Sequence, residues 1–414
     1  MGYLGGVLGA MLTTLFIVFA IATVGYLIGG VKVKGISLGT AGVLLVALAL
    51  GIVFNLCGEK VGDSVLVSFT LGNKTITLYS DAIKKLFDLV SNIGTAMFVT
   101  AVGLIAGPKF FRSFNKSMIS YVAMGAIIIA LGVGLTVLIS ALGGMDMALG
   151  TGLLAGSLTS TPAFSAAKDA AKQISEALEA SVAAGYGIGY LYGVLGVVLF
   201  VQIMPKLMKV NIEKERASFI VAGSVTIEQD DVKRYDIDDF GFFPFCLTVV
   251  LGLIIGAIKI PGINFSLGSS GGTLVSGLIV GHFGHVGKIN LKVSKATLNF
   301  FRELGLMLFL IGAGVPAGIR FIDSFSAWYF VYGIILTTVP MIVGFILGKY
   351  VFKLSIFNNL GSITGGMTST PALGSLINVA GTDDVSAAYA ATYPIALVLI
   401  VVASNLMVTI GCAI

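Results

Sequence analysis

Charged side chains are scarce in this chain: lysine, arginine, aspartate and glutamate make up 11% of its 414 residues, against about 25% in a typical soluble domain. Hydrophobic residues make up 57%. A composition this poor in charge excludes a soluble globular protein and predicts one embedded in a lipid bilayer. In a membrane protein the basic residues mainly mark the loops on the inner side, so the net charge of +5 does not indicate binding to nucleic acid. We expect no nucleic acid as a partner.

The residue types that bind metals are also scarce, with 2 histidines and 3 cysteines. Cys57, Cys246 and Cys412 lie far apart, in no spacing typical of a metal site or a disulfide framework. His282 and His285, near the end of a hydrophobic run, are more simply interfacial histidines than a two-ligand metal site. No hydrophobic run contains a histidine and acid constellation. We therefore expect no metal, no cofactor and no enzymatic activity.

Long hydrophobic runs, by contrast, are abundant. A bilayer core about 30 Å thick needs roughly 20 apolar residues per helix, and this chain has room for ten such helices. Two shorter segments, 148–166 and 358–376, each contain the sequence Thr-Ser-Thr-Pro-Ala. The ten runs with little or no charge lie near 4–28, 38–54, 86–107, 118–142, 182–204, 241–258, 267–283, 296–315, 328–348 and 386–411.

The two Thr-Ser-Thr-Pro-Ala sequences belong to a longer internal repeat. SNIGTAMFVTAVGLIAG at 91–107 is similar to RELGLMLFLIGAGVPAG at 302–318, and further matching blocks follow in the same order. Several matching segments in the same order and at nearly constant spacing indicate a duplication. We therefore predict a duplicated membrane protein, and its parts are repeat 1 at 1–204, a cytoplasmic connector at 205–240 and repeat 2 at 241–414.

The distribution of positive charge indicates the orientation. If each Thr-Ser-Thr-Pro-Ala segment enters and leaves on one side, and both termini lie outside, 16 of the 25 basic residues fall in cytoplasmic loops. Eight lie outside and Arg302 lies within a helix. Each half then has five transmembrane helices and one re-entrant segment. Because five is odd, the second half is inverted relative to the first, an arrangement typical of secondary transporters.

Hydroxyls and prolines at membrane depth indicate a binding site, because irregular backbone there must be buried in protein or line a cavity. Proline disfavours the α region at the preceding residue, so we expect an extended backbone just before it and a helix restarting at the proline. The free N–H groups of such a helix start favour a carboxylate. The alternative is that each proline only kinks a helix. The predicted substrate-binding residues are Thr159, Ser160, Thr161, Pro162, Thr368, Ser369, Thr370 and Pro371.

Arg302 and Glu303 lie inside a predicted helix, where charged groups are costly and usually face the bundle interior. Arg302 could bind a substrate carboxylate or pair with a neighbour, and we include it among the site residues. The acidic residues Asp146, Asp169 and Asp323 are expected in or beside external loops. That scarcity of buried carboxylates favours an anionic substrate. Further candidates are Tyr190, Tyr393 and Asn92.

GSLTSTPAFSAA at 156–167, GGMTSTPALGSL at 365–376 and the tyrosine-rich last helix of each half resemble the bacterial aspartate:alanine exchanger family. The resemblance covers nearly all of the chain except 205–240. It implies an exchanger of amino acids or dicarboxylates in the inner membrane, as a homodimer. Many members carry two regulatory domains in the central loop, and this connector is too short to hold them.

These observations together predict an all-α polytopic membrane protein of the elevator type, in which a substrate-bearing bundle moves past a fixed scaffold. We expect an antiporter of acidic amino acids or dicarboxylates such as aspartate, exchanged for alanine or a related solute. We place it in the bacterial inner membrane, with carboxylate-bearing solutes and the lipid bilayer as its partners. The alternative is a cation channel or a cation/proton antiporter on the same inverted-repeat scaffold.

Overall fold

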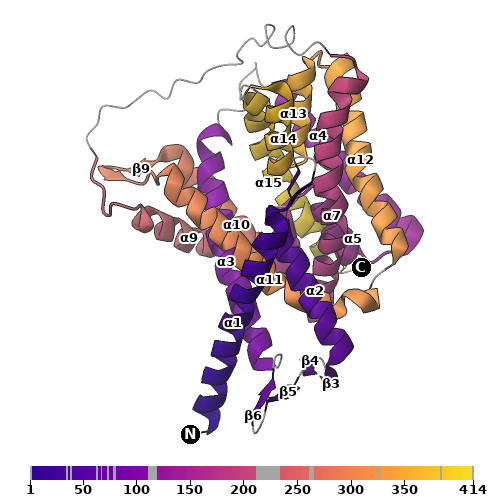
Figure 1. Ribbon diagram of the computed structural model, residues 1–414. Helices are drawn as coiled ribbons and strands as arrows, with labels where there is room; N and C mark the ends of the chain where they lie inside the picture. The colour runs from indigo at the N-terminus through magenta and orange to yellow at the C-terminus, as the bar shows by residue number, and fades with distance from the viewer. Residues whose placement is uncertain are drawn as a thin grey trace.

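The computed structural model describes most of the chain, and nearly all of the described part is helical (Figure 1). Short strands form two-stranded antiparallel sheets, β1 (Lys32–Val33) with β2 (Ile36–Ser37), β3 (Glu59–Val61) with β4 (Ser64–Leu66), β5 (Ser68–Leu71) with β6 (Lys74–Thr77), β7 (Lys259–Ile260) with β8 (Phe265–Ser266), and β9 (His285–Val286) with β10 (Ile289–Asn290). The described residues are 2–33, 36–37, 40–61, 64–66, 68–71, 74–77, 81–110, 119–210, 234–260, 265–324, 326–382 and 385–412.

The helices follow the predicted order, with a pair of short helices at each Thr-Ser-Thr-Pro-Ala sequence. In the first half they are α1 (Gly2–Gly30), α2 (Ala41–Cys57), α3 (Asp81–Phe110), α4 (Ile119–Gly143), α5 (Met147–Ser157), α6 (Thr161–Lys172) and α7 (Glu176–Leu207). In the second half they are α9 (Phe242–Ala257), α10 (Gly268–Phe283), α11 (Lys295–Ser324), α12 (Ala327–Tyr350), α13 (Ile356–Gly366), α14 (Thr370–Ala380) and α15 (Ser386–Gly411).

Seven helices in the described part are long and apolar enough to cross a membrane: α1, α3, α4, α7, α11, α12 and α15. The other predicted spans form shorter helices. α2 has 17 residues, and α9 and α10 have 16 each. At 1.5 Å per residue these three are about 25 Å long, just below the thickness of a bilayer core. The prediction of an all-α polytopic membrane protein is confirmed.

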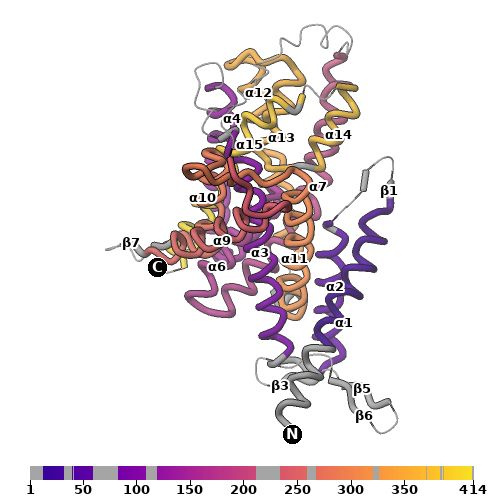
Figure 2. The backbone as a smooth tube through the Cα atoms, turned by 90° about the vertical axis from the view of Figure 1, so that its left-hand side faces the viewer, coloured from indigo at the N-terminus to yellow at the C-terminus, as the bar shows by residue number. Residues whose placement is uncertain are grey.

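The helices pack in two groups. One, here the α3 group, contains α1, α2, α3, α9, α10 and α11; the other, the α7 group, contains α4 to α7 and α12 to α15. Figure 1 shows the first group at the lower left and the second at the upper right. In Figure 2, turned by 90°, α9 and α10 lie in front, and α6 lies close to α9 in this view. The groups meet mainly where α11 contacts α7, α10 contacts α6 and α15 contacts α3.

Glycines bring the backbones within each group close together. A Cβ atom on Gly94 of α3 would overlap the backbone of Phe309 in α11, and one on Gly185 of α7 would overlap the carbonyl oxygen of Leu149 in α5. Only glycine permits this approach. Small residues that allow backbone contact are a common means of packing helices in membranes, where no hydrophobic force drives helices together.

The first Thr-Ser-Thr-Pro-Ala segment is a helical hairpin. α5 runs parallel to α7, because Leu149 lies beside Gly185 and Gly156 beside Gly193, further along both helices. α6 runs back the other way: Thr161 at its start bonds to Tyr186, and Lys168 lies beside Glu179, nearer the start of α7. The segment therefore begins and ends at the same end of α7.

The second segment has the same form. Gly361 of α13 lies against Val385, and Gly365 against Thr392, so α13 runs parallel to α15. Only five residues separate the end of α14 at Ala380 from the start of α15, so α14 must lead back to that end. Gln202, near the end of α7, donates a hydrogen bond to Ser375 of α14. The two hairpins therefore approach each other from opposite ends of α7.

The connector is described only at its two ends. Residues 211–233 of the predicted connector lie outside the described residues. At its far end, the Asp238 carboxylate accepts hydrogen bonds from the N–H groups of Phe240, Phe242 and Phe243 at the start of α9. These bonds, led by that of Phe243, hold the pKa of Asp238 below its ordinary value.

Candidate functional site

Each hairpin turns at a threonine in the left-handed backbone conformation. Thr159 has φ 54° and Thr368 has φ 50°. At each tip the following N–H, of Ser160 or Ser369, bonds back to the helix at 2.8 Å or 3.0 Å, which is the pattern of a Schellman C-cap. Glycine usually occupies such a position, because a side chain there costs roughly 1–2 kcal/mol. Two β-branched residues in this conformation need an explanation.

The explanation is that the two tips bond to each other. The Thr159 hydroxyl donates to the carbonyl oxygen of Met367 at 3.0 Å, and the Thr368 hydroxyl donates to that of Leu158 at 2.9 Å. Both threonines are buried, at 8% and 7% exposed. The bonds are reciprocal and join the hairpins end to end. The threonine hydroxyls at these two positions therefore hold the tips together.

The helices after the tips begin one residue earlier than predicted. α6 begins at Thr161 and α14 at Thr370, and the extended residues are Ser160 and Ser369, with ψ 94° in both. The expectation that Thr161 and Thr370 are extended, with helices restarting at Pro162 and Pro371, is therefore wrong. Serine is a strong N-cap and proline is tolerated in the first turn, where its missing N–H is not needed.

The two helix starts differ in how they are capped. The Ser160 hydroxyl accepts the N–H of Ala163 at 3.4 Å and so caps its own helix. The Ser369 hydroxyl makes no cap bond to α14, and it has no hydrogen-bond partner in the described part of the chain although the residue is 0% exposed. A buried hydroxyl without a partner is costly. The start of α14 therefore offers an unused donor beside the positive end of a helix.

Aromatic side chains pack on the first hairpin just below its tip. The hydroxyls of Thr161 and Tyr186 lie 3.0 Å apart, and the Tyr186 ring stacks on Phe164 at 4.1 Å between centroids. Tyr190 packs against Tyr186 at 5.0 Å. Of the two tyrosines it is thus Tyr186, not the candidate Tyr190, that reaches the Thr-Ser-Thr-Pro-Ala sequence. In the second half, the candidate Tyr393 stacks on Tyr389 at 5.1 Å.

Arg302 lies on α11 and pairs with its neighbour Glu303 at 2.9 Å. Both side chains are partly exposed, at 32% and 49%. Arg302 interacts electrostatically with Tyr393, and Glu303 with Tyr190, so the pair lies near the tyrosines of both closing helices. The candidate Asn92 on α3 is exposed. The structure thus relates Arg302 to Tyr393 and Glu303 to Tyr190, and shows no bond from Arg302 to either tip among the described residues.

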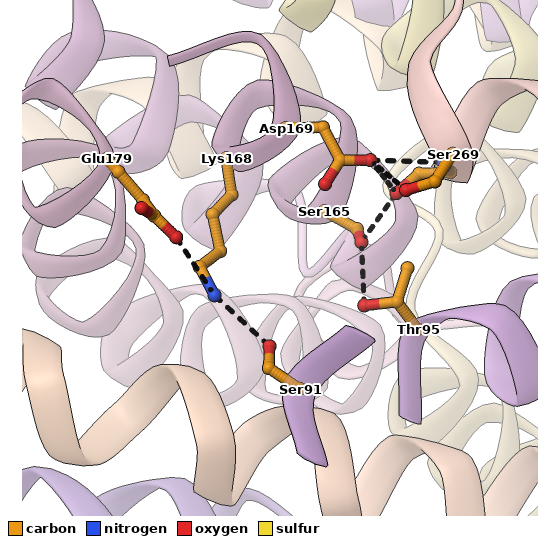
Figure 3. Close-up of polar contacts among 8 residues, drawn as sticks. Ser91, Thr95, Ser165, Lys168, Asp169, Glu179 and Ser269 are labelled. Carbon is orange, nitrogen blue, oxygen red and sulfur yellow. Dashed lines mark hydrogen bonds and ion pairs between the residues drawn. The ribbon is translucent and has the colours of Figure 1, made fainter. Parts of the chain in front are cut away.

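A buried lysine on α6 was not predicted as part of any site. Lys168 pairs with Glu179 of α7 at 3.3 Å and donates to the Ser91 hydroxyl of α3 at 3.1 Å (Figure 3). Its side chain is 10% exposed, and that of Glu179 is 13% exposed. Lys168 is one of the eight basic residues that the predicted orientation places outside, and α6, which continues to Lys172, carries its side chain inside the protein.

Asp169, the next residue, was expected in or beside an external loop, and it lies in the last turn of α6. Its Oδ2 atom accepts hydrogen bonds from the Ser269 hydroxyl at 2.7 Å, the Ser270 hydroxyl at 2.8 Å and the Ser270 N–H at 3.1 Å. The Ser165 hydroxyl joins this cluster through Ser270 at 2.8 Å and Thr95 at 3.3 Å. The spacing of Ser165, Lys168 and Asp169 puts them on one helix face, and this was the available signal.

Comparison with known proteins agrees with the hairpin sequences. The model of the aspartate–alanine exchanger family, described as a predicted permease membrane region, matches residues 17–206 and 244–409. The chain belongs to this family. The resemblance noted from the two Thr-Ser-Thr-Pro-Ala sequences is thereby confirmed. Together with the seven candidate spans, membership makes the protein a multi-span membrane member of a family of predicted permeases.

Relatives of this family member include proteins named uncharacterized transporters. One from Bacteroides fragilis is 35% identical over 211 residues, which is 50% of this chain and 38% of the relative. One from Bacteroides thetaiotaomicron is 37% identical over 202 residues, 47% of this chain and 37% of the relative. One from Rhodopirellula baltica is 36% identical over 165 residues, 39% of this chain and 31% of the relative. The match thus spans less than two fifths of each of these relatives.

Proposed function

We propose that this protein is a secondary antiporter of acidic amino acids or dicarboxylates such as aspartate, exchanged for alanine or a related solute, and that it works without converting them chemically. The observation that carries the proposal is the open start of α14. The buried Ser369 hydroxyl, which has no partner among the described residues, lies there beside the positive end of a helix. Helix starts bind carboxylates readily.

In this proposal the substrate carboxylate lies between the starts of α6 and α14, which approach from opposite sides. Ser369 donates to it first, and opening of the tip bonds made by Thr159 and Thr368 makes room for the rest of the solute. The residues around this seat are the predicted set Thr159, Ser160, Thr161, Pro162, Thr368, Ser369, Thr370 and Pro371.

Arg302 would serve as a second anchor. Its partner Glu303 is 49% exposed, so solvent screens their pairing and a substrate carboxylate can compete for the guanidinium. An arginine that offers two parallel N–H groups suits a second carboxylate, as on aspartate. Tyr190 and Tyr393 would then line the approach between Arg302 and the hairpins.

Transport would occur by movement of the α7 group, which carries both hairpins, past the α3 group. The arrangement of the hairpins at opposite ends of α7 supports an inverted repeat, and the division into two groups supports an elevator mechanism. We propose that the protein acts as a homodimer with both termini outside. Its bacterial relatives support a place in the bacterial inner membrane.

A cation/proton antiporter remains the second candidate, because the structure contains two half-buried carboxylates, those of Asp169 and Glu179. The sequence showed few carboxylates inside the membrane, and this scarcity favoured an anionic substrate over a cation. Each of these two carboxylates, however, already has compensation: Lys168 pairs with Glu179, and two serines and an N–H group donate to Asp169. A compensated carboxylate gains less from a cation than a free one.

The test is counterflow in proteoliposomes with a panel of carboxylates, comparing wild type with Ser369→Ala. Loss of a hydrogen bond to a charged group should weaken binding about 10- to 150-fold. Ser355→Ala is the matched control, because Ser355 caps α13 at the base of the same hairpin. It should retain wild-type affinity.

Two outcomes would contradict the proposal. Unchanged affinity in Ser369→Ala would remove Ser369 from the site. Uptake driven by a proton or sodium gradient, with no counterflow for any carboxylate, would favour the cation antiporter.

A further inference from the structure

One face of α6 carries the polar contacts between the two helix groups. Ser165, Lys168 and Asp169 project from the hairpin toward α3 and α10, which belong to the other group. In Figure 3, Lys168 and Asp169 point in different directions, the lysine toward Ser91 and the aspartate toward Ser269. The two charges therefore have separate partners: the lysine has an ion pair and one hydroxyl, and the aspartate has only neutral donors among the described residues.

Lys168 carries its counter-ion with it. Glu179, its partner at 3.3 Å, lies on α7 in the same group. Among the described residues, only its bond to the Ser91 hydroxyl, at 3.1 Å, crosses to the α3 group. If the groups separate, Lys168 loses one hydrogen bond to a neutral partner and keeps its ion pair.

Asp169 has no such partner in its own group among the bonds of the described residues. All three donors that it accepts from, the hydroxyls of Ser269 and Ser270 and the Ser270 N–H, lie at the start of α10. The N-cap residue of α10, Leu267, makes no side-chain cap bond. Asp169 therefore caps α10 from another helix, and its negative charge lies at the positive end of that helix.

We propose that Asp169 is the latch that holds the α7 group against the α3 group in the conformation described. The latch rests on the proposed function, since it needs the groups to move. When the α7 group moves, α10 loses its cap and Asp169 loses three donors at once. Release of Asp169 is therefore the costly step in the movement, and the Lys168–Glu179 pair travels unchanged.

The first measurement is alkylation of a cysteine placed at the buried interface. Ser165 is 1% exposed, and Ser165→Cys in a background without Cys57, Cys246 and Cys412 should react only when the latch opens. Full-length protein in proteoliposomes is treated with a soluble thiol reagent. Asp169→Asn keeps the shape and removes the charge, so the alkylation rate should rise about tenfold or more.

Three comparisons separate the latch from general loosening. Asp146→Asn removes the charge that caps α5 within the same hairpin and should leave the rate unchanged. The double variant Lys168→Met with Glu179→Gln removes the ion pair and should raise the rate about fivefold or less. Ser269→Ala removes one of three donors and should give a rise smaller than that of Asp169→Asn. This variant keeps the test open if Asp169→Asn fails to fold.

The second measurement traps the groups together. A Cβ on Gly187 of α7 would lie 3.9 Å from Cγ of Leu48 in α2, so Leu48→Cys with Gly187→Cys places two thiols across the group boundary. The disulfide should block counterflow, and a reductant should restore it.

A wild-type alkylation rate in both Asp169→Asn and Ser269→Ala, or equal rates in Asp169→Asn and the Lys168–Glu179 double variant, would overturn the latch. So would a disulfide that leaves counterflow intact. Alkylation needs no substrate, so it tests the latch even if the panel of carboxylates gives no counterflow, which would overturn only the proposed function.

Discussion

At the scale of single residues, the hairpin tips show a trade between backbone strain and hydrogen bonding. Thr159 and Thr368 occupy the left-handed conformation that glycine adopts freely. Glycine at either position would relieve the strain and would remove the donor that joins the tips. The strain of roughly 1–2 kcal/mol and a hydrogen bond of about 1 kcal/mol are similar in size. The threonine hydroxyls therefore join the two tips but add little net free energy of folding.

This trade predicts an unusual order among substitutions. Thr159→Val keeps the branched side chain and its strain but leaves the Met367 carbonyl without a donor, so it should destabilise the protein by about 1 kcal/mol. Thr159→Gly loses the same bond and also loses the strain, so its net effect should be close to zero. The same order should hold at Thr368. Thermal unfolding in detergent measures both, and a glycine variant less stable than the valine variant would show that strain is not the compensating factor.

At the scale of elements, the hydrophobic runs predicted which segments are helical and where the helix pairs lie. They were too short at α6, which continues beyond the predicted segment 148–166 to Lys172 and so includes Lys168 and Asp169. Their burial depends on Ser91 and Ser270, which are distant in sequence and become neighbours only when the groups pack. Nor could the open cap at Ser369 be predicted, since the identical sequence is closed by Ser160 in the other hairpin.

Helix packing leads to a second prediction, about glycines. Gly185→Ala would drive a methyl group into the Leu149 carbonyl, and the backbone of α5 cannot move aside cheaply. Overpacking of this kind costs about 1–3 kcal/mol. Gly134→Ala on α4 is the matched control, because nothing lies within 4 Å of its added methyl group and alanine favours a helix by up to about 1 kcal/mol. The melting temperature should fall for the first and stay or rise for the second; equal melting temperatures would contradict the close contact of α5 and α7.

At the scale of the whole molecule, α7 relates the two hairpins. It is a single helix of 32 residues, about 48 Å long, so its two ends must lie on opposite sides of a membrane that it crosses. The first hairpin has its base near the start of α7, by Glu179, and the second lies toward its end, by Gln202. Each hairpin therefore leads from its own side of the membrane to the junction of the tips. A solute could reach that junction from one side along the first hairpin and from the other side along the second.

The last prediction tests this arrangement together with the proposed orientation. Ile174, between α6 and α7, is 45% exposed, and Lys353, between α12 and α13, is also exposed. The excess of basic residues near the far end of α7 predicts that this end lies inside, so Ile174, at the opposite end, should lie outside. In a chain without its native cysteines, Ile174→Cys should therefore react with an impermeant thiol reagent in intact cells. Lys353→Cys should react only after the membrane is opened. Lys209→Cys, just after the far end of α7, is the internal control and should behave like Lys353→Cys. Labelling of 174 and 353 from the same side would contradict the inverted repeat, whereas an exchange of their sides would keep the repeat and reverse the orientation.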